Sequence, residues 1–203
     1  MRAREIITAL NSPSSPFKAT SEQRKQDAFV HWHALREDWI KLNIDGASNG
    51  NPRPSGGAGI FRDHYENYIK AFACNFSWRT PVMAEVLALF KGLRIAWDMG
   101  YKKLEINLDS QITVKKTEQL CKMNQPLYFI MRECKELMAR RDWEVKLRHC
   151  YREANRVADY FANLGVNQTV LLVIFDSHSP PTVMPFLRDD VFGVSWPRCL
   201  RIE

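Results

Sequence analysis

The chain has 203 residues, of which 45% are hydrophobic and 11% aromatic, and its formal net charge is +6 at pH 7. This length fits one domain of about 100–200 residues with flanking segments, and the apolar content excludes a chain that is disordered through its charge. No window approaches the roughly 18 uninterrupted apolar residues of a membrane span, and the mild basic excess permits an anionic partner without requiring one.

The cysteines do not indicate a disulfide framework. There are five of them, an odd number, and no two form a C-x-x-C pair. This spacing excludes a zinc ribbon and favours buried or free thiols in a reducing compartment.

Composition divides the chain into three segments. Residues 1–38 combine a short helical pattern with a Ser/Pro-rich break at residues 11–16, which indicates an N-terminal helix and a linker. Residues 39–166 hold 20 basic and 14 acidic side chains, so the whole positive excess lies there. We therefore expect one domain over residues 39–166 and a C-terminal tail over residues 167–203.

The first elements of the middle segment are strands. Apolar and polar residues alternate over residues 40–45, which is typical of a half-buried strand. Residues 57–62 and 68–76, separated by a polar turn, predict a hairpin that continues the first strand in antiparallel fashion.

Helices and strands then alternate. A helix follows Thr80-Pro81 and ends at Gly100, and residues 104–108 predict a fourth strand that lies parallel to the first because a crossover helix joins them. A short helix begins near Ser110, and an amphipathic helix follows Pro126. Residues 143–147 make a fifth strand, and a last helix over residues 155–164 is closed by a glycine. The predicted fold class is α/β, with a five-stranded mixed sheet of three antiparallel and then two parallel strands, flanked by helices.

Two aspartates end neighbouring strands of this predicted sheet. Asp45 and Asp109 both point away from the apolar rows of their strands, and parallel neighbours about 4.8 Å apart would bring them together at the carboxyl edge. Two anions there repel unless a cation lies between them, and oxygen ligands suit Mg²⁺ or Mn²⁺. Glu85, in the first turn of the crossover helix, and Asp159, in the first turns of the last helix, are candidates to join them.

Each of these carboxylates also has an ordinary structural explanation. Taken alone, Asp45 precedes a glycine as in a turn, Glu85 suits a helix start, Asp109 suits a strand-to-helix cap, and Asp159 suits a solvated helix face. What favours a functional site is that one sheet edge would gather all four.

Four motifs in order resemble the signature set of type 1 ribonuclease H. They are IDGASNGNP at residues 44–52, AE at 84–85, DSQ at 109–111, and His149 followed by EAN at 153–155 and AD at 158–159. The resemblance covers about residues 39–165. The opening WIKLNIDGA at 39–47 and the closing FGVSWPR at 192–198 further resemble the plant subfamily derived from non-LTR retroelement polyproteins.

The resemblance implies a ribonuclease H-like fold and an endonuclease that hydrolyses the RNA strand of RNA/DNA hybrids with two metal ions, Mg²⁺ or Mn²⁺. It implies that the metal ligands are Asp45, Glu85, Asp109 and Asp159. His149 would assist proton transfer; alone, it is equally well explained as a surface histidine at a strand end. The residues that would contact the hybrid are Asn51, Thr80, Gln111 and Asn155.

Two other functions stay open at this point. A nucleic-acid-binding or protein-interaction module could keep the fold without turnover, and a related nuclease could act on another polynucleotide, for example as an exonuclease. The expected partner is an RNA/DNA hybrid, with no membrane and with a monomer favoured. The chain is either an independent protein or the end of a larger retroelement product, and its substrate class suggests a nuclear or cytoplasmic location.

The tail is too apolar to be a free polar extension. Residues 170–175 read VLLVIF, and four prolines at positions 180, 181, 185 and 197 exclude one continuous helix. We expect short pieces that pack back on the domain; the alternative is an arm that binds a second chain.

Overall fold

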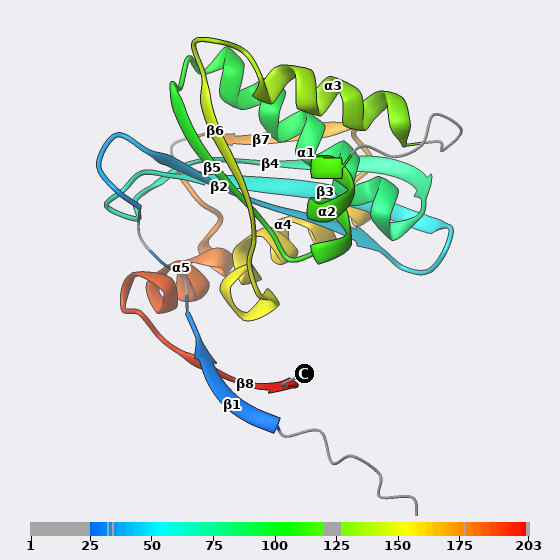
Figure 1. Cartoon of the computed structure of the whole chain (residues 1–203). Helices are drawn as coiled ribbons and strands as arrows, with labels where there is room; N and C mark the ends of the chain where they lie inside the picture. The colour runs from blue at the N-terminus through cyan, green and yellow to red at the C-terminus, as the bar shows by residue number, and fades with distance from the viewer. Residues whose placement is uncertain (1–24, 32, 34, 120–126, 177, 202–203) are drawn as a thin grey trace, which may run out of the picture.

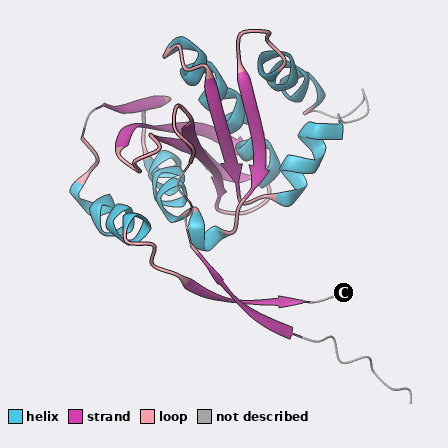
Figure 2. Cartoon of the chain, turned by 60° about the vertical axis from the view of Figure 1, so that its left-hand side comes forward, coloured by secondary structure: helices cyan, strands magenta, loops and turns pink. Residues whose placement is uncertain are grey.

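The structure is a computed structural model, and it describes residues 25–31, 33, 35–119, 127–176 and 178–201. Its main body is a six-stranded sheet with helices on both faces, which confirms the α/β class (Figures 1 and 2). The helix expected near residues 6–10 lies outside the described residues.

From β2 to α4 the elements follow the predicted order, but β1 lies in the segment that was expected to hold only a helix and a linker. The strands are β1 Lys25–Val30, β2 Ile40–Ser48, β3 Arg53–Arg62, β4 Tyr68–Arg79, β5 Lys103–Leu108, β6 Glu144–His149, β7 Leu172–Asp176 and β8 Trp196–Arg201. The helices are α1 Pro81–Asp98, α2 Gln111–Gln119, α3 Tyr128–Met138, α4 Arg156–Asn167 and α5 Met184–Val191, with 3-10 turns η1 Arg152–Ala154 and η2 Pro181–Val183.

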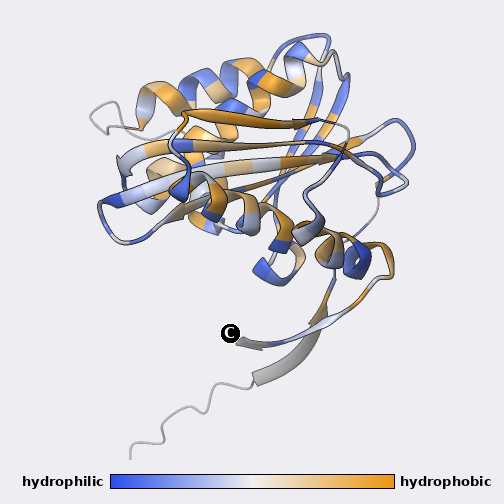
Figure 3. Cartoon of the chain, turned by 180° about the vertical axis from the view of Figure 1, so that it is seen from behind, coloured by the Kyte–Doolittle hydropathy of each residue, from blue (hydrophilic) through white to orange (hydrophobic). Residues whose placement is uncertain are grey.

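The strands of the main sheet run in the order β6-β5-β2-β3-β4-β7. As predicted, β2, β3 and β4 are antiparallel, while β5 is parallel to both β2 and β6. The predicted count of five strands was wrong, because β7 from the tail adds antiparallel to β4, with Ile174 opposite Phe72. Its Leu-Val-Ile-Phe run has high strand propensity and meets an edge that needs hydrogen-bond partners. Figure 3 shows the hydrophobic colour of β7 at this edge.

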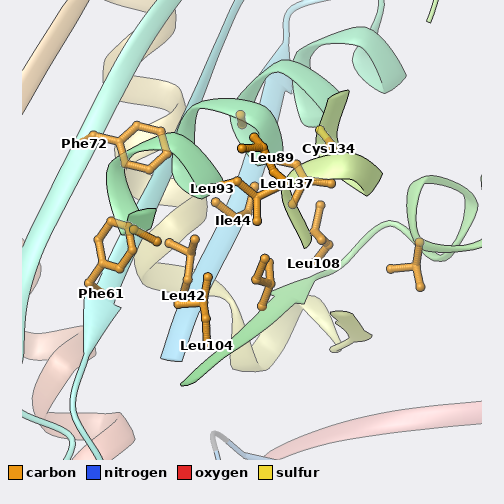
Figure 4. Packing of buried hydrophobic residues seen from close by; sticks show 14 of the residues in the cluster. Leu42, Ile44, Phe61, Phe72, Leu89, Leu93, Leu104, Leu108, Cys134 and Leu137 are labelled. Carbon is orange, nitrogen blue, oxygen red and sulfur yellow. The ribbon is translucent and has the colours of Figure 1, made fainter. Parts of the chain in front are cut away.

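The larger core lies between the sheet and helices α1 and α3 (Figure 4). Leu42 and Ile44 of β2 pack there against Leu89 and Leu93 of α1, and all four are fully buried. Burial of such a side chain stabilises the fold by about 1.5–3 kcal/mol. This face therefore fixes how α1 lies across β2.

The opposite face of β2 is buried as well, so the prediction of a half-buried strand was wrong. Lys41, Asn43 and Asp45 are at most 5% exposed, because β2 lies inside the sheet and α4 covers this polar row. The Lys41 ammonium reaches the His33 carbonyl oxygen, and burial lowers the pKa of Lys41 to about 8. The amide of Asn43 donates to Asn155 Oδ1 at 3.0 Å.

Helix α4 does not end at the predicted glycine. Gly165 is buried inside the helix, and a Cβ at that position would lie 2.5 Å from the carbonyl oxygen of Cys74 on β4. The glycine is therefore explained by the close crossing of α4 over β4 rather than by a helix cap.

The tail contacts the domain at several points. Val183 and Leu187 are buried in a second core with Phe161 of α4, and the guanidinium of Arg62 on β3 donates to Asp190 Oδ2 at 2.7 Å. β8 pairs with β1 in a separate two-stranded ribbon that projects from the body (Figure 1). The boundaries of the three predicted segments stay a prediction. None of the described helices is long and apolar enough to cross a lipid bilayer.

Candidate active site

The two central aspartates lie on neighbouring strands. Asp109 directly follows β5, as predicted, but Asp45 does not end its strand, because β2 continues to Ser48 in its pairing with β3. β2 and β5 are parallel with Ile44 opposite Leu108, so Asp45 and Asp109 come one residue further along each strand. Asp45 is 5% exposed, and the side chain of Asp109 is 9% exposed. The register thus brings the two carboxylates together at the carboxyl edge of the sheet.

The other three predicted carboxylates all affect the pKa of Asp45. The pKa of Asp45 rises to about 8, first through burial and then through the charges of Asp109, Asp159 and Glu85, with a hydrogen bond to Asp109 adding to the rise. A carboxyl group with this pKa holds its proton at neutral pH unless a cation compensates the surrounding charge.

Glu85 lies next to β2 because Gly46 has no side chain. A Cβ at Gly46 would be 2.3 Å from the Glu85 backbone nitrogen, so only glycine allows α1 this approach. Glu85 comes after the first turn of α1, one turn later than predicted, because the helix begins at Pro81. Its Oε2 accepts a hydrogen bond from Thr113 Oγ1, and burial raises its pKa.

Thr113 is a site residue that sequence reasoning missed. It is fully buried, and its backbone N–H donates to Ser110 Oγ at 3.3 Å in the first turn of α2. The spacing of a serine at a helix start and a threonine three residues on predicts capping alone, since nothing in it points to Glu85.

Arg152 forms an ion pair with one of the four carboxylates. Its Nε donates to Asp109 Oδ2 at 2.9 Å, and the hydrogen bond and charge of Asp109 raise its pKa. The side chain is 83% exposed and lies on the turn before α4. Arg152 therefore gives the acidic cluster a counter-charge.

Asp159 and Asn155 lie at the start of α4. Asp159 is exposed, whereas Asn155 is 2% exposed and donates from Nδ2 to the Ile44 carbonyl oxygen at 2.9 Å. Since Asn155 also accepts from Asn43, its amide ties α4 to β2. The structure thus gives Asn155 a positioning role, and its predicted contact with the hybrid stays a prediction.

Two pockets are lined by residues of the site and of the turn before α4. One, of about 340 Å³, is lined by Asp109, Arg152, Glu153, Asn155, Arg156, Asp159 and Trp196. His149, exposed at the end of β6, instead lines a neighbouring pocket of about 520 Å³ together with Asn107 and Cys150. Its ring meets the Tyr151 ring edge-on, with centroids 5.4 Å apart.

The other predicted contact residues lie outside the smaller pocket and are exposed. Asn51 is in the turn between β2 and β3, and Gln111 begins α2. Thr80 caps α1, where its Oγ1 accepts from the Met83 backbone N–H at 3.3 Å.

The donor set fits hard divalent cations. Carboxylate oxygens are the ligands that Mg²⁺ and Mn²⁺ prefer, and the raised pKa of Asp45 marks an excess of negative charge that such ions offset. Within the described ranges, no three His, Cys, Asp or Glu side chains already form a metal centre. Arg152 engages Asp109 and Thr113 engages Glu85, so these side chains would turn to receive an ion.

Comparison with known proteins shows which family the domain is similar to. Residues 43–165 match the family model described as reverse transcriptase-like. An Arabidopsis thaliana protein named as a putative ribonuclease H protein is 31% identical over 180 residues, which cover 89% of this chain but only 29% of that relative.

Solved structures show the same fold. RNase H1 from the archaeon Halobacterium salinarum is 26% identical, with a TM-score of 0.59, and the match covers 64% of this chain and 98% of that one. LC11-RNase H1 in complex with an RNA/DNA hybrid is 23% identical, with a TM-score of 0.58, covering 63% and 96% of the two chains. The chain therefore belongs to the reverse transcriptase-like family and contains an RNase H-like domain.

Proposed function

We propose that this chain is a ribonuclease H that cleaves the RNA strand of RNA/DNA hybrids internally. One observation carries the proposal: Asp45 is buried in the central strand β2, and the charges of Asp109, Asp159 and Glu85 all act on it. Clustered carboxylates do not stabilise a fold, since their mutual repulsion costs free energy. Metal-assisted hydrolysis of a phosphodiester requires such a cluster.

Asp45, Glu85, Asp109 and Asp159 would hold two divalent ions, Mg²⁺ or Mn²⁺. When bound, the ions would lower the pKa of an attacking water and offset charge on the scissile phosphate. The protein's own part is orientation: Gly46 lets Glu85 approach Asp45, and Asn155 fixes α4 against β2.

His149 would move protons and assist product release from the strand end beside the cluster. The side chain is exposed and lines the pocket of about 520 Å³, at the end of the strand next to β5. Proton transfer by a positioned histidine typically contributes about 10²–10⁴-fold to a rate.

Selectivity for RNA would come from contacts to 2′-hydroxyls in the minor groove. Asn51 and Gln111 are exposed on a turn and at a helix start, where they could contact the backbone and minor groove of the hybrid. Thr80, exposed before α1, would contact a phosphate of the DNA strand. The name of the Arabidopsis relative and the hybrid-bound LC11-RNase H1 support this substrate class. Membership of a larger retroelement-type protein and a monomeric state stay predictions.

A nuclease assay tests the proposal. Labelled RNA/DNA hybrid, RNA duplex and DNA duplex are incubated with the protein in Mg²⁺, in Mn²⁺ or in chelator, with Asp45→Asn as the matched control. We expect internal cuts in the RNA of the hybrid alone, only with metal and only with Asp45 present. Tight hybrid binding without cleavage in either metal would instead identify a binding module.

A further inference from the structure

One wall of the pocket beside the carboxylates comes from outside residues 43–165, the range of the family match. The family match ends at residue 165, yet Trp196 of β8 lines the pocket of about 340 Å³ together with Asp109 and Asp159. The C-terminal segment therefore reaches the place where the proposed chemistry happens.

The ring of Trp196 makes a cation–π contact with Arg156. The guanidinium of Arg156 lies 4.3 Å from the centroid of the Trp196 ring and 4.5 Å from that of Phe186. Arg156 also donates from Nη1 to Asp189 Oδ2 at 2.9 Å. Since these partners lie on α5 and β8, the tail fixes the first residue of α4 from several sides.

Arg198, two residues further along β8, makes a second set of contacts with the turn before α4. Arg198 Nη1 donates to both carboxylate oxygens of Glu153, at 3.0 and 2.8 Å, and its guanidinium lies 4.4 Å from the centroid of the Tyr151 ring. Residues two apart on a strand point to the same face. Trp196 and Arg198 therefore contact the same region of the chain. This region carries Arg152 and leads into the helix turn that holds Asp159.

The chemistry of this pocket suits a nucleotide. Its lining includes Asp109 and Asp159, two of the carboxylates proposed to act on the scissile phosphate. It also includes the positive charge of Arg152, which suits a neighbouring phosphate, and the aromatic ring of Trp196. Aromatic rings bind bases or sugars of nucleic acids without regard to sequence. We propose that Trp196 contacts a sugar or base of the hybrid beside the scissile phosphate, so that the C-terminal segment forms part of the substrate site. This proposal rests on the proposed function for the identity of the substrate.

Binding is measured first, in an Asp45→Asn background that prevents cleavage. Fluorescence anisotropy of a labelled RNA/DNA hybrid is compared for Trp196→Ala, Trp196→Phe and Phe192→Ala. Phe192 is the matched control, because it is an aromatic residue of the same segment, 79% exposed and outside the pocket. We expect Trp196→Ala to raise the Kd about 5- to 100-fold, the range for loss of one stacked base. Trp196→Phe and Phe192→Ala should stay within about 3-fold of the background.

A second readout does not depend on whether Trp196→Ala folds. Acrylamide quenching is recorded for the protein and for Trp196→Phe, with and without hybrid, and the difference between the two reports Trp196 alone. Saturating hybrid should shield this residue. The proposal is overturned if acrylamide quenches Trp196 fluorescence equally with and without hybrid. It is also overturned if Trp196→Ala folds and its Kd for the hybrid is unchanged.

These outcomes separate the two proposals. Cleavage of the hybrid with Trp196 left unshielded refutes the tryptophan contact and leaves the ribonuclease function standing. Shielding of Trp196 by hybrid that is bound but never cleaved refutes the function and leaves the contact standing. Failure to bind hybrid at all refutes both.

Discussion

Removal of the Asp190 carboxylate should loosen the tail from the domain. The Arg62 guanidinium and the Asp190 carboxylate are 2.7 Å apart, and their side chains are 1% and 8% exposed. Burial lowers the pKa of Arg62 and raises that of Asp190, so desolvation opposes both charges. Asp190→Ala leaves the buried guanidinium without this carboxylate, which costs about 3–5 kcal/mol. In a protein of this size each kcal/mol shifts the Tm by about 2–4 °C, so a fall of about 6–20 °C is expected.

The double variant Arg62→Met with Asp190→Leu tests the cause. Replacement of a buried ion pair by apolar side chains of similar size is often neutral, because the desolvation of both charges disappears with their attraction. We therefore expect the double variant to recover most of the lost Tm. Asp176→Ala is the matched control: its carboxylate is also 2.7 Å from an ammonium, that of Lys70, but the aspartate side chain is 64% exposed. Its loss should cost less than about 1 kcal/mol.

Thermal and urea unfolding followed by circular dichroism measure these effects. If the Tm of Asp190→Ala lies within 2 °C of that of the control variant, the two differ by about 1 kcal/mol or less. That result would refute the reasoning. A double variant no more stable than Asp190→Ala would also refute it, because geometry rather than an uncompensated charge would then explain the loss.

Three further predictions concern the carboxylate edge. Asp45→Asn should abolish cleavage while it stabilises the metal-free fold. The pKa of about 8 means that folded Asp45 holds a proton which the unfolded chain releases near pH 4. The Tm of the metal-free protein should therefore fall between about pH 4 and 8, and it should fall less in the variant. His149→Ala should slow single-turnover cleavage by roughly 10- to 1000-fold with unchanged Mg²⁺ binding by calorimetry; weaker Mg²⁺ binding would make His149 a ligand. Gly46→Ala should push α1 from β2, cost about 1–3 kcal/mol in urea unfolding and remove cleavage; a fully active variant would contradict this.

The arrangement of Asp45 and Asp109 could be predicted because it depends on regular geometry. Alternation placed both residues on one side of their strands, the crossover helix made the strands parallel, and parallel strands align their carboxyl ends. The register in the structure agrees, with Ile44 opposite Leu108. The order of the strands and helices in the middle segment was predictable for the same reason.

Contacts between distant segments could not be predicted. Thr113 and Arg152 meet Glu85 and Asp109 only after the chain has folded, and no local pattern marks the pairing. Burial of both faces of β2 depends on α4, which packs on a row of residues that reads as solvent-facing. Strand β7 could not be predicted from its own residues, because an apolar run of six residues fits a strand and a buried turn of helix equally well.

The pairing of β1 with β8 has a consequence for the order of folding. Nearly all of the described chain lies between these two strands, and the entropy lost on closing a loop rises with its length. The ribbon should therefore form after the central sheet, whose neighbours are closer in sequence. During synthesis, β8 leaves the ribosome after every other described element. A nascent chain would complete its carboxylate edge first, and the turn between β6 and α4 would gain its contacts with Trp196 and Arg198 only once residues 196–198 had emerged.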